Sequence, residues 1–165
     1  MPSLAFKQKK KEGIWFQELV YPLLENLGME VIDSDKERYE IKKGYDCLVR
    51  LKDSDGSYKR KENGHVIQDR LEIKLDKMSE QTGNVFVDLD SIRKSTASIW
   101  IYGLPEGSSI GVYATLLADL GPCAESYPIK RPGGEFGLSG ALIPKATFIS
   151  LPFVKKFKVI QLTAT

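Results

Sequence analysis

The chain contains few residues of the types that build zinc sites and disulfide frameworks. Its 165 residues include two cysteines, Cys47 and Cys123, and a single histidine, His65. The cysteines lie far apart and form no CxxC pair. The sequence therefore argues against a structural zinc site, a disulfide-stabilised scaffold and a histidine-based HNH nuclease centre.

Long apolar runs are also missing. No segment approaches the ~20 consecutive apolar residues that a membrane-spanning helix needs, and the first residues, MPSLAFKQKKK, contain no signal-peptide core. We therefore expect no membrane association and a cytoplasmic protein.

Neither sign of charge is in large excess. The chain has 24 Lys and Arg against 22 Asp and Glu, a net charge of +2, which neither requires nor excludes a nucleic-acid partner. Hydrophobic residues make up 42% of the chain and charged residues 28%, as in ordinary globular proteins. A chain of this length is large enough to bury a core, and we expect one domain.

The N-terminal part divides into a basic segment and a helix. Residues 1–11 contain Lys7, Lys9, Lys10 and Lys11 and are predicted to form a flexible, solvated leader; the alternative is an arm that contacts phosphates. Residues 12–165 are predicted to form the single domain. Apolar residues recur at helical spacing from Glu12 to Leu27, and Gly28 is suited to end this helix. Pro22 predicts a local kink in it.

The remaining chain predicts a series of strands with few helices. The expected strands are Glu30–Asp33, Arg38–Lys42, Gly44–Leu51, Arg70–Asp76, Asn84–Leu89, Ser98–Tyr102 and Ile110–Thr115. A short helix is expected at Leu116–Leu120, a loop rich in Gly and Pro at Gly121–Gly140, and a closing strand, helical turn and tail within Thr147–Leu162. This pattern predicts an α/β fold with a mixed central sheet flanked by helices.

Two of these strands carry the residues with the clearest chemical meaning. In Gly44–Leu51, alternation places Tyr45, Cys47, Val49 and Leu51 on one face and Asp46, Leu48 and Arg50 on the other. In Arg70–Asp76, Glu72 and Lys74 share the face opposite Leu71, Ile73 and Leu75. If the strands are neighbours, Asp46, Glu72 and Lys74 converge as two carboxylates for a hard cation and one amine. The alternative is an exposed salt-bridge face, which is common in β-proteins.

The segment between these strands contains turn dipeptides and a basic triplet. Asp55-Gly56 and Asn63-Gly64 predict a β-hairpin rather than a calcium loop, because the EF-hand pattern is incomplete. This segment also contains Lys59, Arg60 and Lys61. These residues are expected either to contact a phosphate backbone or to be simply solvated, and the sequence favours neither interpretation.

Four stretches in order resemble the PD-(D/E)XK nuclease superfamily, particularly its small phage-type and prokaryotic members. They are Trp15–Leu19 with Glu18, Lys43–Asp46, Leu71–Lys74, and Thr82–Asp88 followed by Lys94–Tyr102. The resemblance covers roughly Glu12 to Leu162. The chain departs from the pattern where no proline precedes Asp46, where many relatives have glutamate in place of Asp88, and where many have lysine in place of Thr96.

The resemblance implies a restriction-endonuclease-like fold and a set of roles. Asp46, Glu72 and the Ile73 carbonyl would bind Mg²⁺ or Mn²⁺, and Lys74 would orient or deprotonate the attacking water or hold the phosphate. Glu18 would be a further catalytic residue or metal ligand; the alternative is an ordinary solvated glutamate. The implied DNA contacts are Thr82, Asn84, Lys94, Ser95 and Thr96, although Gly83-Asn84 also fits a plain turn. The basic triplet is a further candidate contact because of its clustered charge alone.

Together these expectations predict that the protein is a metal-dependent DNA endonuclease. A structure-selective enzyme, a single-strand or repair nuclease and a Holliday-junction resolvase all remain open, and resolvases of this kind act as homodimers. The resemblance to phage-type members extends the expected location to the cytoplasm of an infected host cell. The rival from another class is a non-catalytic nucleic-acid-binding module on the same fold.

Overall fold

The computed structural model describes residues 4–33, 44–130 and 139–162. The helices are α1 (Leu4–Asn26), α2 (Ser79–Thr82), α3 (Leu89–Lys94), α4 (Leu117–Glu125) and α5 (Lys145–Ser150). The strands are β1 (Met29–Asp33), β2 (Cys47–Leu51), β3 (Gln68–Leu75), β4 (Asn84–Asp88), β5 (Ile99–Glu106), β6 (Ser109–Leu116), β7 (Ile129–Lys130), β8 (Gly140–Pro144) and β9 (Val154–Gln161).

The strands form two sheets. The larger has the order β1-β2-β3-β5-β6-β9, and the smaller has the order β4-β8-β7. In the larger sheet β3 and β5 are parallel, whereas the other neighbours are antiparallel. The chain between β3 and β5 passes through α2, β4 and α3, which gives it the length that a parallel crossover requires. The prediction of an α/β fold with a mixed central sheet flanked by helices is confirmed.

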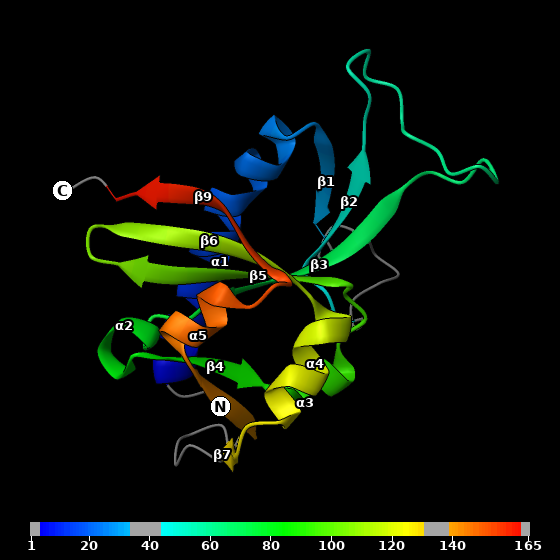
Figure 1. Ribbon diagram of the computed structural model, residues 1–165. Helices are drawn as coiled ribbons and strands as arrows, with labels where there is room; N and C mark the ends of the chain where they lie inside the picture. Colours follow the sequence, from blue (N-terminus) through cyan, green and yellow to red (C-terminus); the bar gives the residue numbers. More distant parts are fainter. Residues whose placement is uncertain (1–3, 34–43, 131–138, 163–165) are drawn as a thin grey trace.

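A separate apolar core lies on each face of the larger sheet. On one face, Phe16, Val20 and Leu24 of α1 pack against alternate residues of the strands, including Leu71 and Ile73 of β3. On the other face, residues of β5 pack against the small sheet and the remaining helices: Trp100, Tyr102, Val85, Val87, Leu120, Ile143 and Phe148 are among the buried residues. Figure 1 shows the same layers, with α1 behind the sheet and α4, α5 and β4 on the opposite side.

Several predicted boundaries were wrong. The first helix begins at Leu4 rather than Glu12, so the segment expected as a flexible leader is largely helical; its lysine and glutamine residues are good helix formers. The helix passes through Pro22 and ends before Gly28, whose φ of 84° is the left-handed conformation expected after a helix.

The region expected as one long loop also contains regular structure. Helix α4 continues through Pro122 to Glu125, because Leu120, Gly121 and Ala124 are buried on one side of it. Helix α5 replaces the start of the predicted closing strand, and β9 follows it. The predicted strand Arg38–Lys42 lies outside the described residues. Both cysteines are free thiols, and no helix of the described segments is long and apolar enough to cross a membrane.

Candidate metal and hydrolysis site

The site lies where β2 and β3 separate. Before β2 begins at Cys47, the Asp46 amide donates to the Leu71 carbonyl at 2.8 Å, and the Asp46 Oδ2 atom accepts from the Ile73 amide at 2.7 Å. The carboxylate therefore takes the place of the backbone acceptor that a longer β2 would provide. Because the N–H and C=O of one strand residue point to the same side, the Ile73 carbonyl points toward this gap as well.

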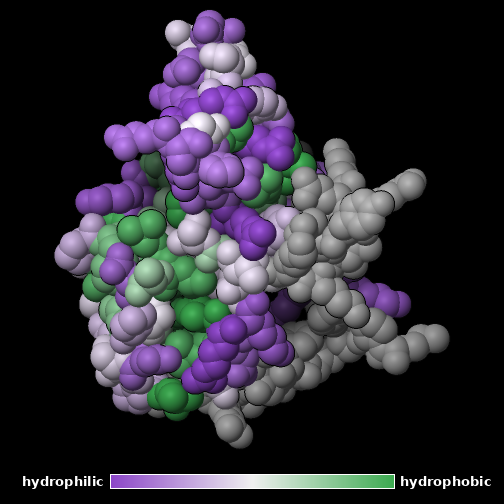
Figure 2. Space-filling model, turned by 90° about the vertical axis from the view of Figure 1, so that its right-hand side faces the viewer, coloured by the Kyte–Doolittle hydropathy of each residue, from purple (hydrophilic) through white to green (hydrophobic). Residues whose placement is uncertain are grey.

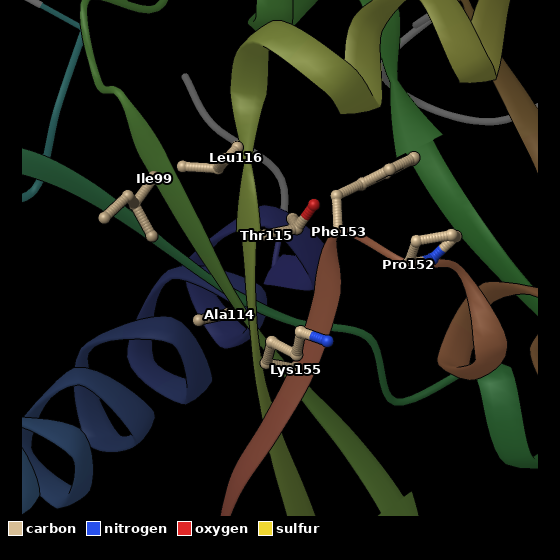
Figure 3. Close-up of a pocket in the computed structure, with 7 residues that line it drawn as sticks. All are labelled: Ile99, Ala114, Thr115, Leu116, Pro152, Phe153 and Lys155. Atoms are coloured by element: carbon tan, nitrogen blue, oxygen red, sulfur yellow. The ribbon is translucent and has the colours of Figure 1, made fainter.

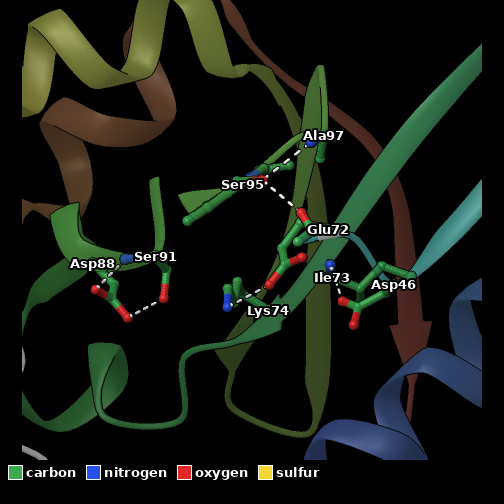
Figure 4. Close-up of polar contacts among 10 residues, drawn as sticks. Asp46, Glu72, Ile73, Lys74, Asp88, Ser91, Ser95 and Ala97 are labelled. Atoms are coloured by element: carbon green, nitrogen blue, oxygen red, sulfur yellow. Dashed lines mark hydrogen bonds and ion pairs between the residues drawn. The ribbon is translucent and has the colours of Figure 1, made fainter. Parts of the chain in front are cut away.

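Glu72 and Lys74 reach the site from the face of β3 predicted for them. The Lys74 Nζ atom lies 2.7 Å from Glu72 Oε1 and 5.1 Å from the centre of the Trp100 ring. Glu72 and Lys74 pair in register with Trp100 and Tyr102 of β5, both of which belong to the buried core on that face of the sheet. Figure 4 shows Asp46 and Glu72 on either side of Ile73, with Lys74 beside Glu72.

The Asp46 carboxyl group is strongly perturbed. Burial, followed by the nearby charge of Glu72, raises the pKa of Asp46 to about 7, although the Ile73 hydrogen bond and the Lys74 charge oppose the shift. A buried carboxylate beside a second carboxylate favours either a proton or a cation. A raised carboxyl pKa of this kind is what a metal-binding site shows when the metal is absent.

The donor set fits a hard divalent cation. Asp46 Oδ1 and Glu72 Oε2 have no hydrogen-bond or ion-pair partner among the described residues, since the other oxygen of each carboxylate makes the contacts given above. Together with the Ile73 carbonyl they offer oxygen ligands, which Mg²⁺ and Mn²⁺ prefer. The described segments contain no group of three or more Asp, Glu, His or Cys side chains placed to hold a metal ion, so the site rests on two carboxylates.

Glu18 is not brought to this site. It lies two residues after Phe16 and two before Val20, both fully buried against the sheet. At about 100° per residue, this spacing directs Glu18 to the opposite side of α1, where it is exposed. The solvated-glutamate interpretation fits this position.

The Lys94-Ser95-Thr96 segment does lie beside the site. Gly44, two residues before Asp46, has a φ of 70°, and a Cβ atom there would collide with the Lys94 carbonyl. The Gly44 carbonyl accepts from the Ser95 hydroxyl at 3.0 Å and from the Thr96 amide at 3.1 Å. Lys94 and Thr96 are exposed next to this contact, where they remain predicted DNA contacts.

Thr82 and Asn84 lie at another end of the sheet. They hydrogen-bond to each other around the turn at Gly83, and the neighbouring Glu80 carboxylate accepts from the amide of Gly107 in the β5–β6 turn. That turn is five residues beyond Tyr102, about 17 Å along an extended strand. The plain-turn interpretation describes these contacts, and any role in DNA binding would be distant from the carboxylates.

The basic triplet lies on a connection that projects from β2 and β3. Two turns, closed by Gly56 N to Asp53 O and Gly64 N to Lys61 O, replace the single hairpin tip that we predicted. Ile67 N donates to Lys59 O, and Ile67 lies six residues before Ile73, so the triplet is about 20 Å from the site. Figure 2 shows this projection at the top of the molecule with a mainly hydrophilic surface.

Two residues that the sequence motifs do not include, Arg70 and Tyr45, lie on the same side of the sheet as Glu72 and Lys74. Arg70 shares the Glu72 and Lys74 face, and its guanidinium lies 5.2 Å from the centre of the Tyr45 ring. Tyr45 itself packs on that side, not with Cys47 as predicted, because β2 starts only after it. The same two-residue spacing that selected Glu72 and Lys74 would have identified Arg70 as a candidate phosphate contact.

Tyr21 and Asp33 lie on the α1 side of the site. The Tyr21 hydroxyl donates to Asp33 Oδ2 at 2.9 Å, and burial and this bond raise the Tyr21 pKa. The charge of Asp33 contributes to the raised pKa of Asp46. No sequence motif connects these residues, so only the pairing of β1 with β2 reveals them.

An open pocket of about 440 Å³ lies elsewhere, between the start of β5, the last residues of β6 and the start of β9. Its lining includes Ile99, Leu116, Phe153 and Lys155 (Figure 3), and it contains none of the candidate site residues. Its surface is almost entirely apolar, which does not suit phosphodiester chemistry.

Comparison with protein-family models finds no match, and comparisons with curated proteins and with solved structures find none either. The sequence and the geometry and chemistry of the site are therefore the only indications of its function.

We predict that Asp46→Asn stabilises the metal-free protein at high pH. The unfolded chain loses the Asp46 proton near pH 4, whereas the folded protein retains it to about pH 7. The contribution of Asp46 to native stability therefore falls as pH rises from 4 to 7, by on the order of 2–4 kcal/mol. Asparagine carries no charge but still accepts from Ile73, so the variant avoids this loss.

Denaturant unfolding in EDTA at pH 4 and pH 8 measures the effect. The two proteins should be similarly stable at pH 4, and the variant should be more stable at pH 8. Adding Mn²⁺ at pH 8 should stabilise the native protein but not Asp46→Asn. An equal stability difference at both pH values would contradict the assigned titration of Asp46.

Proposed function

We propose that the protein is a metal-dependent DNA endonuclease that hydrolyses phosphodiester bonds. The observation that carries the proposal is the convergence of the Asp46 and Glu72 carboxylates at the gap between β2 and β3, with Lys74 ion-paired to Glu72. The resemblance to PD-(D/E)XK nucleases supports the same activity from the sequence.

In this proposal Asp46, Glu72 and the Ile73 carbonyl hold Mg²⁺ or Mn²⁺. A cation held there would neutralise charge on the phosphate and make a water molecule easier to deprotonate. The two carboxylates also keep the local potential negative, so a phosphate enters only with a cation or with cationic side chains nearby.

Lys74 provides such a side chain. Glu72 and the Trp100 ring hold its ammonium group on the site face of β3, and its side chain remains about one-third exposed. It is therefore placed to hold a phosphate oxygen or to orient the attacking water. Arg70, on the same face, supplies a second cation for the DNA backbone.

The proposed substrate is DNA in the cytoplasm. A structure-selective enzyme, a single-strand or repair nuclease and a Holliday-junction resolvase are the candidate activities, and the resolvase would act as a homodimer. A non-catalytic nucleic-acid-binding module is the alternative outcome of the experiment that follows.

The experiment measures cleavage of end-labelled single strands, duplexes, flaps and four-way junctions with Mg²⁺, Mn²⁺ or EDTA. We expect metal-dependent cleavage of at least one structure and none in EDTA. Asp46→Asn, which preserves the hydrogen bond to Ile73, should bind DNA without cleaving it. DNA binding without metal-dependent cleavage by the native protein would favour the non-catalytic module.

We predict that the projecting connection binds phosphates of the DNA backbone. Replacing Lys59, Arg60 and Lys61 with glutamine should weaken DNA binding and reduce its salt dependence, by about one unit of slope for each phosphate that the variant no longer binds. Because the triplet lies about 20 Å from the site, about six base steps of 3.4 Å, the weakening should be largest for substrates that extend beyond that length. Binding titrations at several salt concentrations measure it.

The matched control replaces Lys155, Lys156 and Lys158 of β9 with glutamine. These exposed lysines lie on an edge strand separated from β3 by β5 and β6, and the charge removed is the same. We expect a smaller change in slope in this control. An equal change in both variants would indicate non-specific attraction rather than binding by the connection.

A further inference from the structure

The Ser95 hydroxyl connects two parts of the candidate site: the Gly44 backbone, which leads to Asp46, and the Trp100 ring, which lies beneath Lys74. It donates to the Gly44 carbonyl at 3.0 Å and accepts from Trp100 Nε1 at 3.2 Å. It also accepts from the Ala97 amide at 3.2 Å (Figure 4). A serine hydroxyl has one proton and two lone pairs, so its hydrogen-bonding capacity is fully used inside the protein. Ser95 therefore has no donor left for a DNA phosphate, the role that the family resemblance implied for it.

The first of these bonds positions the segment that carries Asp46. Gly44 adopts a left-handed conformation, closely packed against the Lys94 carbonyl, and its own carbonyl also accepts from the Thr96 amide. Two residues later, Asp46 leaves this anchored backbone and reaches the Ile73 amide. The Ser95–Gly44 bond thus limits where the Asp46 carboxylate can lie.

The second bond positions the ring beneath Lys74. Trp100 is fully buried, and its indole N–H has the Ser95 hydroxyl as acceptor. The Lys74 ammonium group lies 5.1 Å from the ring centre, within cation–π range. The orientation of the indole therefore affects the position of the Lys74 charge.

We infer that Ser95 is a positioning residue that sets the Asp46 carboxylate and the Lys74 ammonium group relative to each other. Its hydroxyl acts through Gly44 on one side and through Trp100 on the other, and it touches neither the cation nor the substrate. The inference rests on the proposed nuclease function and extends it to a residue outside the Asp and Glu-x-Lys motif.

The first readout is spectroscopic and needs no activity. The chain has two tryptophans, so ¹H–¹⁵N spectra contain two indole signals, which Trp15→Phe assigns. Ser95→Ala should move the Trp100 indole signal and speed its hydrogen exchange. Ser98→Ala is the matched control: it removes a hydroxyl three residues further along, bonded to Asp69 instead. It should leave the Trp100 signal unchanged.

The second readout separates the effect of Ser95 through Gly44 from its effect through Trp100. Ser95→Ala should weaken Mn²⁺ binding and lower the single-turnover cleavage rate, each by about tenfold or more, the usual effect of losing a partner of a ligand. Trp100→Phe removes the indole N–H together with the five-membered part of the ring, but it leaves the Ser95–Gly44 bond in place. It should therefore lower the rate with little change in Mn²⁺ affinity. Ser95→Ala in a Lys74→Ala background should cost less rate than in the native background. Ser98→Ala should match the native protein in both measurements.

The outcomes distinguish the two levels of the proposal. A shifted indole signal with native Mn²⁺ affinity and native cleavage would overturn the positioning role and leave the nuclease function intact. Unchanged Trp100 signals in Ser95→Ala would overturn it as well. If the native protein neither binds Mn²⁺ nor cleaves DNA, the proposed function fails and the positioning role fails with it.

Discussion

Replacing Asp46 or Glu72 with alanine is expected to abolish DNA cleavage while the protein stays folded. Each change removes one of the two carboxylates that the site offers, and neither side chain belongs to an apolar core. The stabilisation that a bound cation gives to phosphodiester hydrolysis amounts to several kcal/mol, so the rate should fall by about 10³-fold or more. Isothermal titration with Mn²⁺ should show no binding in either variant, and circular dichroism should show retained structure.

Glu18→Ala provides the matched carboxylate control. Glu18 is exposed on the side of α1 that faces away from the sheet, so its loss should leave Mn²⁺ affinity and cleavage close to native. Native cleavage by Asp46→Ala or Glu72→Ala would refute the assignment of the metal site. A loss in Glu18→Ala as large as in those two variants would show that α1 supplies a third ligand after all.

Lys74→Ala is expected to separate chemistry from binding. The side chain carries no metal-ligand role, and its removal takes a positive charge away from Glu72. Mn²⁺ affinity should therefore be retained or slightly increased, and DNA affinity should fall by no more than the loss of one phosphate contact among many. The single-turnover rate should fall by about 10²-fold or more, because a group that orients or deprotonates the attacking water contributes on that scale. Quench-flow with saturating enzyme measures the rate independently of product release.

Lys77→Ala removes a lysine three residues further along the chain and serves as the control. Its ammonium group pairs with Glu12 of α1 at 3.0 Å and is more exposed than that of Lys74. Its rate should be native. If Lys74→Ala also cleaves at the native rate, Lys74 is only a surface lysine, the nuclease proposal rests on two carboxylates alone, and the non-catalytic module becomes the better explanation.

The stability of the protein and its proposed activity place opposite demands on Asp46. Burial beside Glu72 makes the charged carboxylate costly in the metal-free protein, yet the same arrangement attracts a divalent cation. The chain supports the position by anchoring it on both sides, through the Ile73 amide and through Gly44. A carboxylate in this setting is better explained by ligand binding than by a structural role, because an asparagine would make the same hydrogen bond without the electrostatic penalty.

Much of the sheet was predictable because strand alternation is a local property. Glu72 and Lys74 share a face opposite Leu71 and Ile73, as the two-residue period requires. The Gly121-Pro122 pair, in contrast, suggested a loop, and only the burial of Leu120 and Ala124 accounts for the helix there. The N-terminal helix was predicted too short, since the lysine-rich segment has helical propensity but no apolar periodicity of its own.

By itself, the sequence determined the residue types of the candidate site and the faces of β3 on which they lie, because side-chain direction follows from the extended backbone alone. Only the tertiary structure decided which of those residues meet. Strand pairing brought Asp46 to the Ile73 amide, the packing of α1 turned Glu18 away, and the crossover between β3 and β5 brought Ser95 to Gly44 and Trp100. The Asp46–Ile73 and Ser95–Gly44 contacts join residues 27 and 51 positions apart in the chain, so strand register and packing set them, and no local pattern encodes them.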